Sequence, residues 1–228
     1  MKEKIGCLLV HGFGGGPGEL EPLAKFLESK GMQTLLPVLK GHTGKRADIK
    51  GVSYRDWVQS GEAALKELLD RCNCVFVIGF SMGGLVAVSL PPFPQIKGLV
   101  LLNTPIYPWN LKRILLNLVE DMKRRHYGHF RFYVSCILKF PLSALIEFVR
   151  FLRAVKPRFR EVHTPLFIAQ ALQDDVVQPR SAEYIHRHAS SLDKTLKYYD
   201  GSAHLICHSE ARFQLFEDIL AFIQKCCS

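Results

Sequence analysis

The sequence predicts an α/β fold, in which a mostly parallel sheet of about six strands carries helices on both faces and a helical cap insert. Two observations predict this architecture. Short apolar runs alternate with longer segments in which apolar residues recur at helical spacing. The alternation is interrupted once, at residues 105–160, where two helical patterns follow each other with no strand between them. With 228 residues, of which 48% are hydrophobic, the chain is long enough for one sizeable core.

Six short apolar runs mark the expected strands. They cover residues 5–10, 32–38, 74–79, 97–103, 164–172 and 195–200. Because helical segments alternate with these runs, we expect the strands to lie parallel in one sheet with helices on both faces.

The expected core helices lie between these strands. The first covers residues 17–30, with Pro17 near its start and Gly31 just past its end, as is usual for helices. Another follows Ser81 directly, where a second apolar run begins. The remaining core helices are expected at residues 54–70, 179–189 and 209–225.

The interruption predicts a helical cap inserted after the fourth strand. The expected organisation is a core of residues 1–104 and 161–228, with the cap at residues 105–160. Two apolar stripes at helical spacing predict two cap helices. Their members are Leu111, Ile114, Leu115, Leu118 and Met122, then Leu142, Leu145, Ile146, Val149 and Leu152.

The cap carries all of the excess positive charge. Residues 110–160 hold 12 Lys and Arg against three acids, a net charge of +9 that equals the charge of the whole chain. The charge has three interpretations: a solvated face of a lid, a surface that approaches anionic lipid, or selection of a negatively charged substrate or acidic partner. The lid would shape an acyl pocket with its phenylalanines, Phe130, Phe132, Phe140, Phe148 and Phe151. Nucleic acid is not an expected partner, because no nucleic-acid motif accompanies the charge.

Several classes of protein are excluded by the remaining composition. No apolar run approaches the ~20 residues of a membrane-spanning helix. The apolar run near the N-terminus is too short for a signal peptide and leads into glycines, so we expect a cytoplasmic protein. The seven cysteines lack the spacing of zinc ligands and are expected to be reduced thiols, so neither metal nor another cofactor is expected.

One pentapeptide predicts a nucleophile. Residues 79–83, Gly-Phe-Ser-Met-Gly, fit the G-x-S-x-G turn between a strand and a helix. In such a turn a strained backbone projects the Ser81 hydroxyl above the sheet, and the glycines two residues away on each side leave room for it. The alternative is an ordinary strand-to-helix turn, so the serine needs a base and an acid elsewhere in the chain.

Both partners occur in the expected order. Asp174 follows the fifth strand and His204 follows the sixth, as in the order Ser, Asp, His along the chain. Asp174 is preferred to Asp175, because the first acid stands at the strand end and the second is expected to face solvent. His208 is the nearest competitor of His204, but we expect it to be a solvated or capping residue at the start of the last helix.

A serine that attacks a carbonyl group creates a negatively charged oxygen, the oxyanion, which needs two backbone N–H donors. One is expected from Met82, directly after the nucleophile, and the other from Phe13 in the glycine cluster of residues 12–16. The glycines let the backbone approach the substrate closely. A phosphate-binding loop is the alternative, but the cluster lacks both G-x-G-x-x-G spacing and the Lys-Ser/Thr ending of a P-loop. His11 is expected to be structural.

Several stretches, in order, resemble the α/β-hydrolase superfamily, and in particular its small bacterial carboxylesterases and monoacylglycerol lipases. They are LLVHGFGG, LPVLKGHTG, DWVQSGEAALKEL, VIGFSMGG, QALQDDVVQP and GSAH. The resemblance implies Ser81 as nucleophile with Asp174 and His204, and the Phe13 and Met82 amides as oxyanion hole. It also implies that the loop around His42 lies near the active-site mouth. We further expect substrate contacts from Gly12, Gly14, His42 and Trp109.

The expected function is hydrolysis of short- to medium-chain acyl esters through an acyl-enzyme on Ser81, with monoacylglycerols as a specific candidate. One alternative is another reaction on the same scaffold, such as that of a thioesterase, a C–C hydrolase or a lyase. The other is a small-molecule receptor that keeps the three residues but turns over poorly. The expected partner is a small-molecule ester; weak contact of the basic cap with an anionic membrane and a homodimer are further expectations.

Overall fold

The computed structural model describes residues 4–125, 127–128, 131 and 140–227. Its strands form one six-stranded sheet in the order β2-β1-β3-β4-β5-β6, and every neighbouring pair is parallel. The prediction of a mostly parallel sheet of six strands is therefore confirmed. The strands are β1 (Ile5–Val10), β2 (Gln33–Leu35), β3 (Cys74–Phe80), β4 (Ile96–Leu102), β5 (Leu166–Ala171) and β6 (Lys194–Tyr199).

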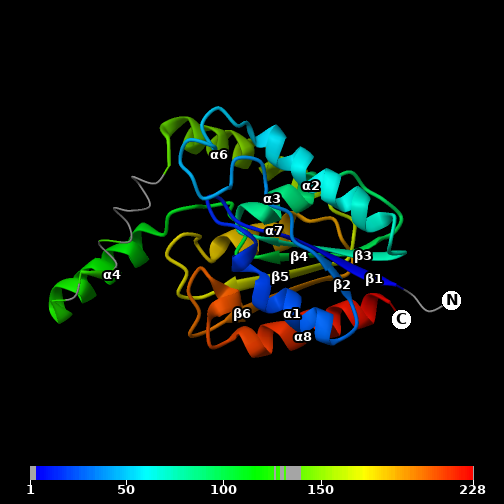
Figure 1. Cartoon of the computed structure of the whole chain (residues 1–228). Helices are drawn as coiled ribbons and strands as arrows, with labels where there is room; N and C mark the ends of the chain where they lie inside the picture. Colours follow the sequence, from blue (N-terminus) through cyan, green and yellow to red (C-terminus); the bar gives the residue numbers. More distant parts are fainter. Residues whose placement is uncertain (1–3, 126, 129–130, 132–139, 228) are drawn as a thin grey trace.

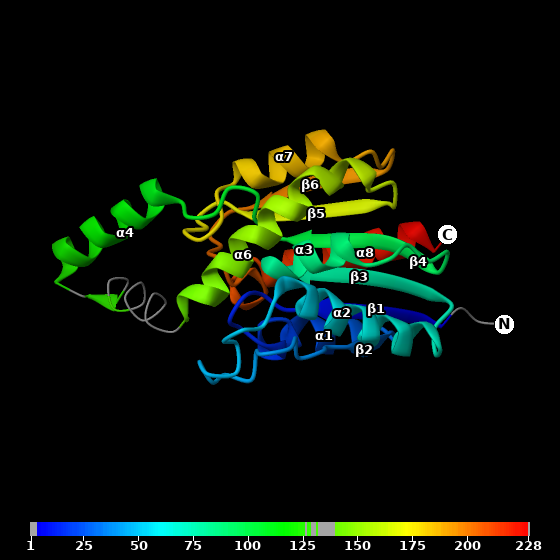
Figure 2. The same cartoon turned by 90° about the horizontal axis from the view of Figure 1, so that it is seen from above.

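Helices cover both faces of the sheet (Figures 1 and 2). One face carries α2 (Tyr54–Leu69), α3 (Met82–Ser89), α6 (Leu142–Val155) and α7 (Arg180–His188). The other carries α1 (Glu21–Ser29) and α8 (Arg212–Cys226). Helix α4 (Leu111–Arg124) stands away from both layers, beyond the carboxyl ends of the strands (Figures 1 and 2).

Each face has its own hydrophobic layer, and the strands contribute alternate residues to the two. On the side of α2 and α6, the buried rings of Trp57 and Phe151 lie 6.1 Å apart, centroid to centroid. On the side of α8, the rings of Phe76 and Phe222 lie 6.2 Å apart. Because both faces of the sheet are covered, the central strands read as nearly continuous apolar runs.

Some element bounds differ from the sequence prediction, and prolines account for two of the differences. Residues 17–30 form a 3-10 turn, η1 (Pro17–Glu19), and then α1, which begins with Pro22 in its first turn. Proline has no N–H, so it suits the first turn of a helix. Strand β2 ends at Leu35, two residues before Pro37, rather than extending to residue 38. The last helix begins at Arg212 rather than residue 209, after the 3-10 turn η3 (Ile206–His208).

The segment 105–160 carries α4 and α6 between β4 and β5, and ends in the 3-10 turn η2 (Lys156–Glu161). Phe148 and Phe151 of α6 are buried against the core, and Phe140 contacts the ring of Phe13. Phe130 and Phe132 lie outside the described residues. The bounds of the cap remain a prediction.

Two sequence expectations concern the membrane and the thiols. Within residues 4–125, 127–128, 131 and 140–227, no helix is both long and apolar enough to cross a bilayer. The cytoplasmic location stays a prediction.

The sulfur atoms of Cys74 and Cys227 come within 3.2 Å of each other at the amino end of β3, far along the strand from Ser81.

Candidate active site

Ser81 occupies a sharp turn between β3 and α3. Its backbone has φ 51° and ψ −123°, a region that residues other than glycine rarely adopt. The turn is held from both sides, because Ser81 N donates to Leu102 O at 2.8 Å and Gly84 N donates to Ser81 O at 2.9 Å. A strained residue of this kind costs about 1–3 kcal/mol and persists only where its surroundings fix it.

The two glycines of the pentapeptide are required by close backbone approaches. A Cβ on Gly79 would lie 2.4 Å from the carbonyl oxygen of Gly83. A Cβ on Gly83 would lie 2.0 Å from the carbonyl oxygen of Val10. Helix α3 therefore packs against β1 with no room for a side chain, and this packing sets the position of Ser81.

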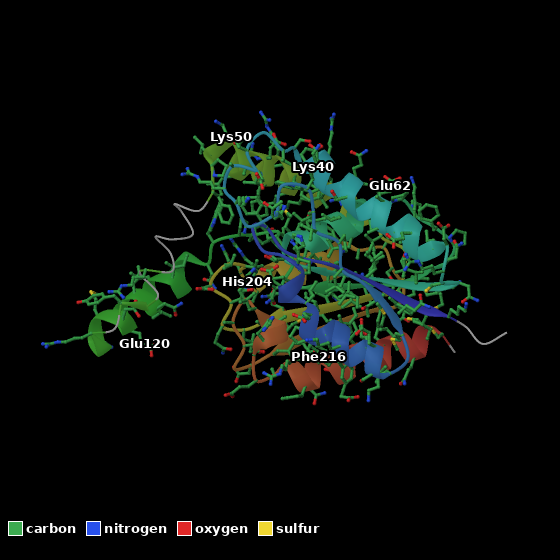
Figure 3. The ribbon with its side chains drawn as sticks, viewed as in Figure 1. Lys40, Lys50, Glu62, Glu120, His204 and Phe216 are labelled. Atoms are coloured by element: carbon green, nitrogen blue, oxygen red, sulfur yellow. The ribbon has the colours of Figure 1, made fainter. Side chains whose placement is uncertain are left out.

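Three side chains from three separate loops form a continuous chain of hydrogen bonds. The Ser81 hydroxyl donates to Nε2 of His204 at 3.1 Å, and Nδ1–H of His204 donates to Oδ2 of Asp174 at 2.8 Å. The other oxygen of Asp174, Oδ1, accepts the amides of Val176 and Val177, each at 2.8 Å. Asp174 is fully buried and the side chain of His204 is 18% exposed. Figure 3 shows His204 at the end of the sheet that faces α4.

The pKa of His204 reflects opposing effects. Burial lowers it, whereas the charge of Asp174 and the hydrogen bond to Asp174 raise it, with further contributions from Glu19 and Asp175. The net result is a pKa above the ordinary value of 6.5. A base with a raised pKa takes a proton from a serine more readily, provided that the pH leaves it unprotonated.

Two asparagines hold the backbone of His204 and Asp174 in place, and the sequence analysis did not identify either of them. Asn103 is fully buried with φ 46°; its Nδ2 donates to the carbonyl of His204 at 2.8 Å, and its Oδ1 accepts the amide of Ala171 at 2.8 Å. Asn110 Nδ2 donates to the carbonyl of Asp174 at 3.0 Å. A polar residue directly after the apolar run of β4 was the only signal for Asn103, and Asn110 had none.

The loop after β1 lies directly beside Ser81. A Cβ on Gly12 would lie 3.2 Å from Cβ of Ser81. Met82 is buried and is the first residue of α3, a position whose N–H has no partner within the helix. The residues expected to supply the two oxyanion donors, Phe13 and Met82, therefore belong to the two segments that adjoin the serine.

The ring of Phe13 points into an aromatic group beneath α6. Its centroid lies 4.7 Å from that of Phe140, 5.3 Å from that of Phe148 and 5.7 Å from that of Trp57. Gly14, with φ 68°, lies so close to the Phe140 ring that a Cβ would come within 2.1 Å of it. This apolar wall borders the loop that adjoins Ser81.

The two histidines near this loop, His11 and His42, are buried and form hydrogen bonds with backbone groups. Nδ1–H of His11 donates to the carbonyl of Gly12 at 2.8 Å, and Nε2 accepts the amide of Leu39 at 3.1 Å. Burial lowers the pKa of His11 to about 4, so the ring is neutral near pH 7. His42 is also buried, and its Nδ1–H donates to the carbonyl of Lys40 at 3.2 Å.

The residues expected to contact substrate take different positions. Gly12 adjoins Ser81, whereas Gly14 and His42 line a small surface pocket together with Lys45, Arg46 and Phe140. Trp109 lies just before α4, where its amide donates to Val176 O at 2.6 Å and its side chain is half-exposed. Across the described ranges no group of three or more His, Cys, Asp or Glu side chains could hold a metal ion.

The competitors of Asp174 and His204 lie apart from the hydrogen-bond chain that joins these residues to Ser81. His208 belongs to η3, and its Nε2 bonds the carbonyl of Gly18 at 2.9 Å, so it joins two loops rather than starting the last helix. Asp175 is half-buried, and its carbonyl accepts the amide of Asn110.

Similarity to known proteins extends over nearly the whole chain. A model described as the alpha/beta hydrolase family matches residues 7–218. A thermostable monoacylglycerol lipase from Bacillus sp. (strain H-257) is 30% identical over 232 residues, which cover 97% of this chain and 91% of that protein. A carboxylesterase from Bacillus subtilis (strain 168) is 24% identical over 235 residues, which cover 96% of this chain and 92% of that protein.

Solved structures show the same fold. A metagenome-derived lipolytic enzyme, from work on LipS and LipT, superposes with a TM-score of 0.80 at 22% identity, covering 98% of this chain and 94% of that one. A monoglyceride lipase from Saccharomyces cerevisiae superposes with a TM-score of 0.74 at 17% identity, covering 99% and 88%. At these identities the likeness is one of fold.

Proposed function

Because the chain belongs to the alpha/beta hydrolase family, and is an enzyme of the lipase and esterase type, we propose that it hydrolyses carboxylic esters through an acyl-enzyme on Ser81. The observation that carries this proposal is the hydrogen-bond chain from Ser81 through His204 to the buried Asp174. The proposed substrates are short- to medium-chain acyl esters, among them monoacylglycerols.

The first half of the reaction forms the acyl-enzyme. Ser81 Oγ attacks the ester carbonyl carbon while its proton passes to Nε2 of His204, and Asp174 stabilises the resulting imidazolium. The amides of Phe13 and Met82 donate to the oxyanion of the tetrahedral intermediate. The intermediate then collapses, and His204 returns the proton to the departing alcohol.

The second half releases the acid. Water attacks the acyl carbonyl and gives its proton to His204, the same amides bind the oxyanion, and the proton returns to Ser81 Oγ as the carboxylic acid leaves. No step requires a metal or an organic cofactor.

The aromatic group beside Phe13 supports an apolar acyl chain as the part of the substrate nearest the oxyanion loop. Phe13 and Phe140 are partly exposed and form the surface of this group, whereas Phe148 of α6 and Trp57 of α2 are buried and pack against Phe13. Burial of each CH2 group against such a wall is worth about 0.8 kcal/mol. We therefore expect kcat/KM to rise with acyl length until the chain outgrows the wall.

The test is steady-state turnover of p-nitrophenyl esters of increasing acyl length, with 1-monoacylglycerols as a second series. Ser81→Ala should lower kcat by about 10³-fold or more. Ser89→Ala, at the far end of the same helix α3, is the matched control and should retain activity within about threefold.

Other results would point to the alternatives. Ligand binding with negligible turnover by the wild-type chain would indicate a receptor and refute the ester hydrolase. Turnover confined to acyl thioesters would instead indicate a thioesterase with the same acyl-enzyme chemistry, and would refute the proposed substrate class.

We propose in addition that the cap contacts anionic membrane surfaces through α4. Leu115 and Met122, seven residues apart on α4, are each 63% exposed, whereas Asn117 and Asp121 are buried. The helix thus presents apolar side chains outward and buries polar ones. Lys123 and Arg125, both exposed, adjoin Met122. An apolar stripe bordered by cations is typical of helices that lie in the interface of an anionic bilayer.

A further inference from the structure

Glu19 holds the loop that adjoins the serine from behind. It is the last residue of η1, three residues after the glycine cluster. Its Oε2 accepts the amide of Gly12 at 2.8 Å. The carboxylate also lies flat against Gly15, where a Cβ would fall 2.1–2.3 Å from its oxygen and carbon atoms. The side chain therefore fills the inner side of the turn formed by residues 12–15.

Gly12 lies between this carboxylate and the nucleophile. A Cβ on Gly12 would meet Oε2 of Glu19 at 3.3 Å and Cβ of Ser81 at 3.2 Å. Phe13, the residue proposed to donate to the oxyanion, is the next residue along. A shift of the Gly12 peptide would thus carry the Phe13 amide with it, and oxyanion donors lose their effect when they are displaced by about 1 Å.

The loops of Glu19 and His204 are also joined directly. His208 Nε2–H donates to Gly18 O at 2.9 Å, which ties η3 to η1. The charge of Glu19 contributes to the raised pKa of His204, and it also raises the pKa of the buried Cys207 beyond the effect of burial. The other charges that act on His204 are those of Asp174 and Asp175, from the loop after β5.

A neutral oxygen acceptor can also hold the Gly12 amide, although a carboxylate accepts the hydrogen bond more strongly. A negative charge close to a forming oxyanion is in itself unfavourable, so a charged group at this position needs a compensating role. The imidazolium of His204, which forms in the same transition state, supplies that role, because a nearby anion stabilises it.

We propose that Glu19 is a positioning residue, whose carboxylate fixes the Gly12 peptide so that the Phe13 amide faces the oxyanion. The charge of the same carboxylate, held beside Gly12 and Ser81, has a second effect, because it favours the protonated form of His204. The inference rests on the proposed function. It assigns to one side chain the alignment of the oxyanion loop and part of the basicity of the catalytic histidine.

The two effects are separated by two substitutions. Glu19→Gln keeps an oxygen acceptor for the Gly12 amide and removes the charge, whereas Glu19→Ala removes both. Glu21→Gln is the matched control, because it removes an equal charge two residues away, where Glu21 pairs with Lys25 at the surface. The readouts are the pH profile of kcat/KM, the separate values of kcat and KM at high pH, and the thermal unfolding of each variant.

We expect the acid limb of the profile to move to lower pH by roughly 0.3 to 1 unit in Glu19→Gln, since loss of a nearby negative charge lowers the pKa of His204. Its plateau should stay within about threefold of wild type. In Glu19→Ala the plateau should fall about 10- to 100-fold, mainly in kcat, because an oxyanion donor is displaced. Glu21→Gln should change neither.

If the acid limb of the kcat/KM profile of Glu19→Gln coincides with that of Glu21→Gln, the proposed effect of the Glu19 charge on His204 is overturned. A plateau in Glu19→Ala within threefold of the control would overturn the positioning effect. If Glu19→Ala is unfolded at the assay temperature, the Gln variant still decides, because a Glu19→Gln plateau about tenfold or more below that of Glu21→Gln would also contradict positioning through an acceptor. Failure of the proposed function is distinguishable, because the wild-type chain would then hydrolyse no ester at any pH.

Discussion

Ser81 combines two properties that rarely occur together, a buried hydroxyl side chain and a positive φ. An ordinary strand-to-helix turn would place glycine or asparagine in that conformation. Here the serine is kept in it by hydrogen bonds on both sides and by glycines that admit the neighbouring backbone. The strain is what points the hydroxyl at His204 rather than into the helix.

At the same scale, the pH dependence of the reaction follows from His204. Its pKa is raised above 6.5, and only the unprotonated ring can accept the serine proton. We therefore expect kcat/KM to fall as the pH decreases through a midpoint above 6.5. Asp174→Asn should lower kcat by about 10⁴-fold, because an amide favours the wrong tautomer of the histidine.

Asp175→Asn is the control for that experiment, since it removes an adjacent charge and leaves the bond between Asp174 and His204 in place. It should retain most of the plateau activity. Equal losses in the two variants would mean that local charge, and not the oriented hydrogen bond, is what the reaction uses.

At the scale of elements, the contact between α3 and β1 determines the geometry of the turn. Gly83→Ala would place a Cβ 2.0 Å from the Val10 carbonyl, which is backbone and cannot move aside alone. We expect the free energy of unfolding to fall by about 3 kcal/mol, measured by denaturant titration. Gly18→Ala, where a Cβ meets nothing within 4 Å, should change it by less than about 0.5 kcal/mol. Comparable losses in both variants would contradict this account of the packing.

The elements themselves were largely predictable from the sequence, and their ends were not. Covered parallel strands are apolar throughout, so β1, β3, β4 and β5 stand out as runs between helical patterns. The 3-10 turns at Pro17–Glu19 and Ile206–His208 have no periodic signal, because each is a single turn fixed by contacts with the other. The helical spacing of residues 17–30 predicts a single α-helix that includes the first of these turns, and no pattern predicts the second.

At the scale of the whole molecule, the sheet brings distant residues to one edge. Gly12, Ser81, Asp174 and His204 each follow the carboxyl end of a different parallel strand, and these ends meet at one side of the sheet. Topology alone therefore predicted that they would lie near one another. Asn103 also follows a strand end, that of β4, so topology places it at this edge. Its bond to the carbonyl of His204 could not be predicted, nor could the bond of Glu19 to the Gly12 amide, because both join loops whose conformations no local pattern specifies.

The position of α4 beyond that edge leads to the membrane prediction. Binding to vesicles containing anionic lipid should weaken in Lys123→Gln/Arg125→Gln and in Leu115→Ser/Met122→Ser, measured by co-sedimentation. Hydrolysis of a short water-soluble ester should stay within a few-fold in both. The control is Gln59→Ala, a substitution at an exposed position of α2 (Tyr54–Leu69), a helix that is not part of the proposed membrane surface.

Equal binding by wild type and both double variants would contradict the membrane proposal. A concentration-dependent dimer of the wild type that is lost only in Leu115→Ser/Met122→Ser, with no vesicle binding, would assign the apolar stripe to a second copy of the chain instead.

The central claim is that Ser81 is the nucleophile, and covalent labelling tests it most directly. A serine-directed fluorophosphonate, followed by proteolysis and mass spectrometry, should modify one site, Ser81, and should leave Ser81→Ala unlabelled. Labelling should slow as the pH falls, with the same midpoint as kcat/KM, because both need unprotonated His204. Label on any other residue, or none on the folded wild-type chain, would contradict the account.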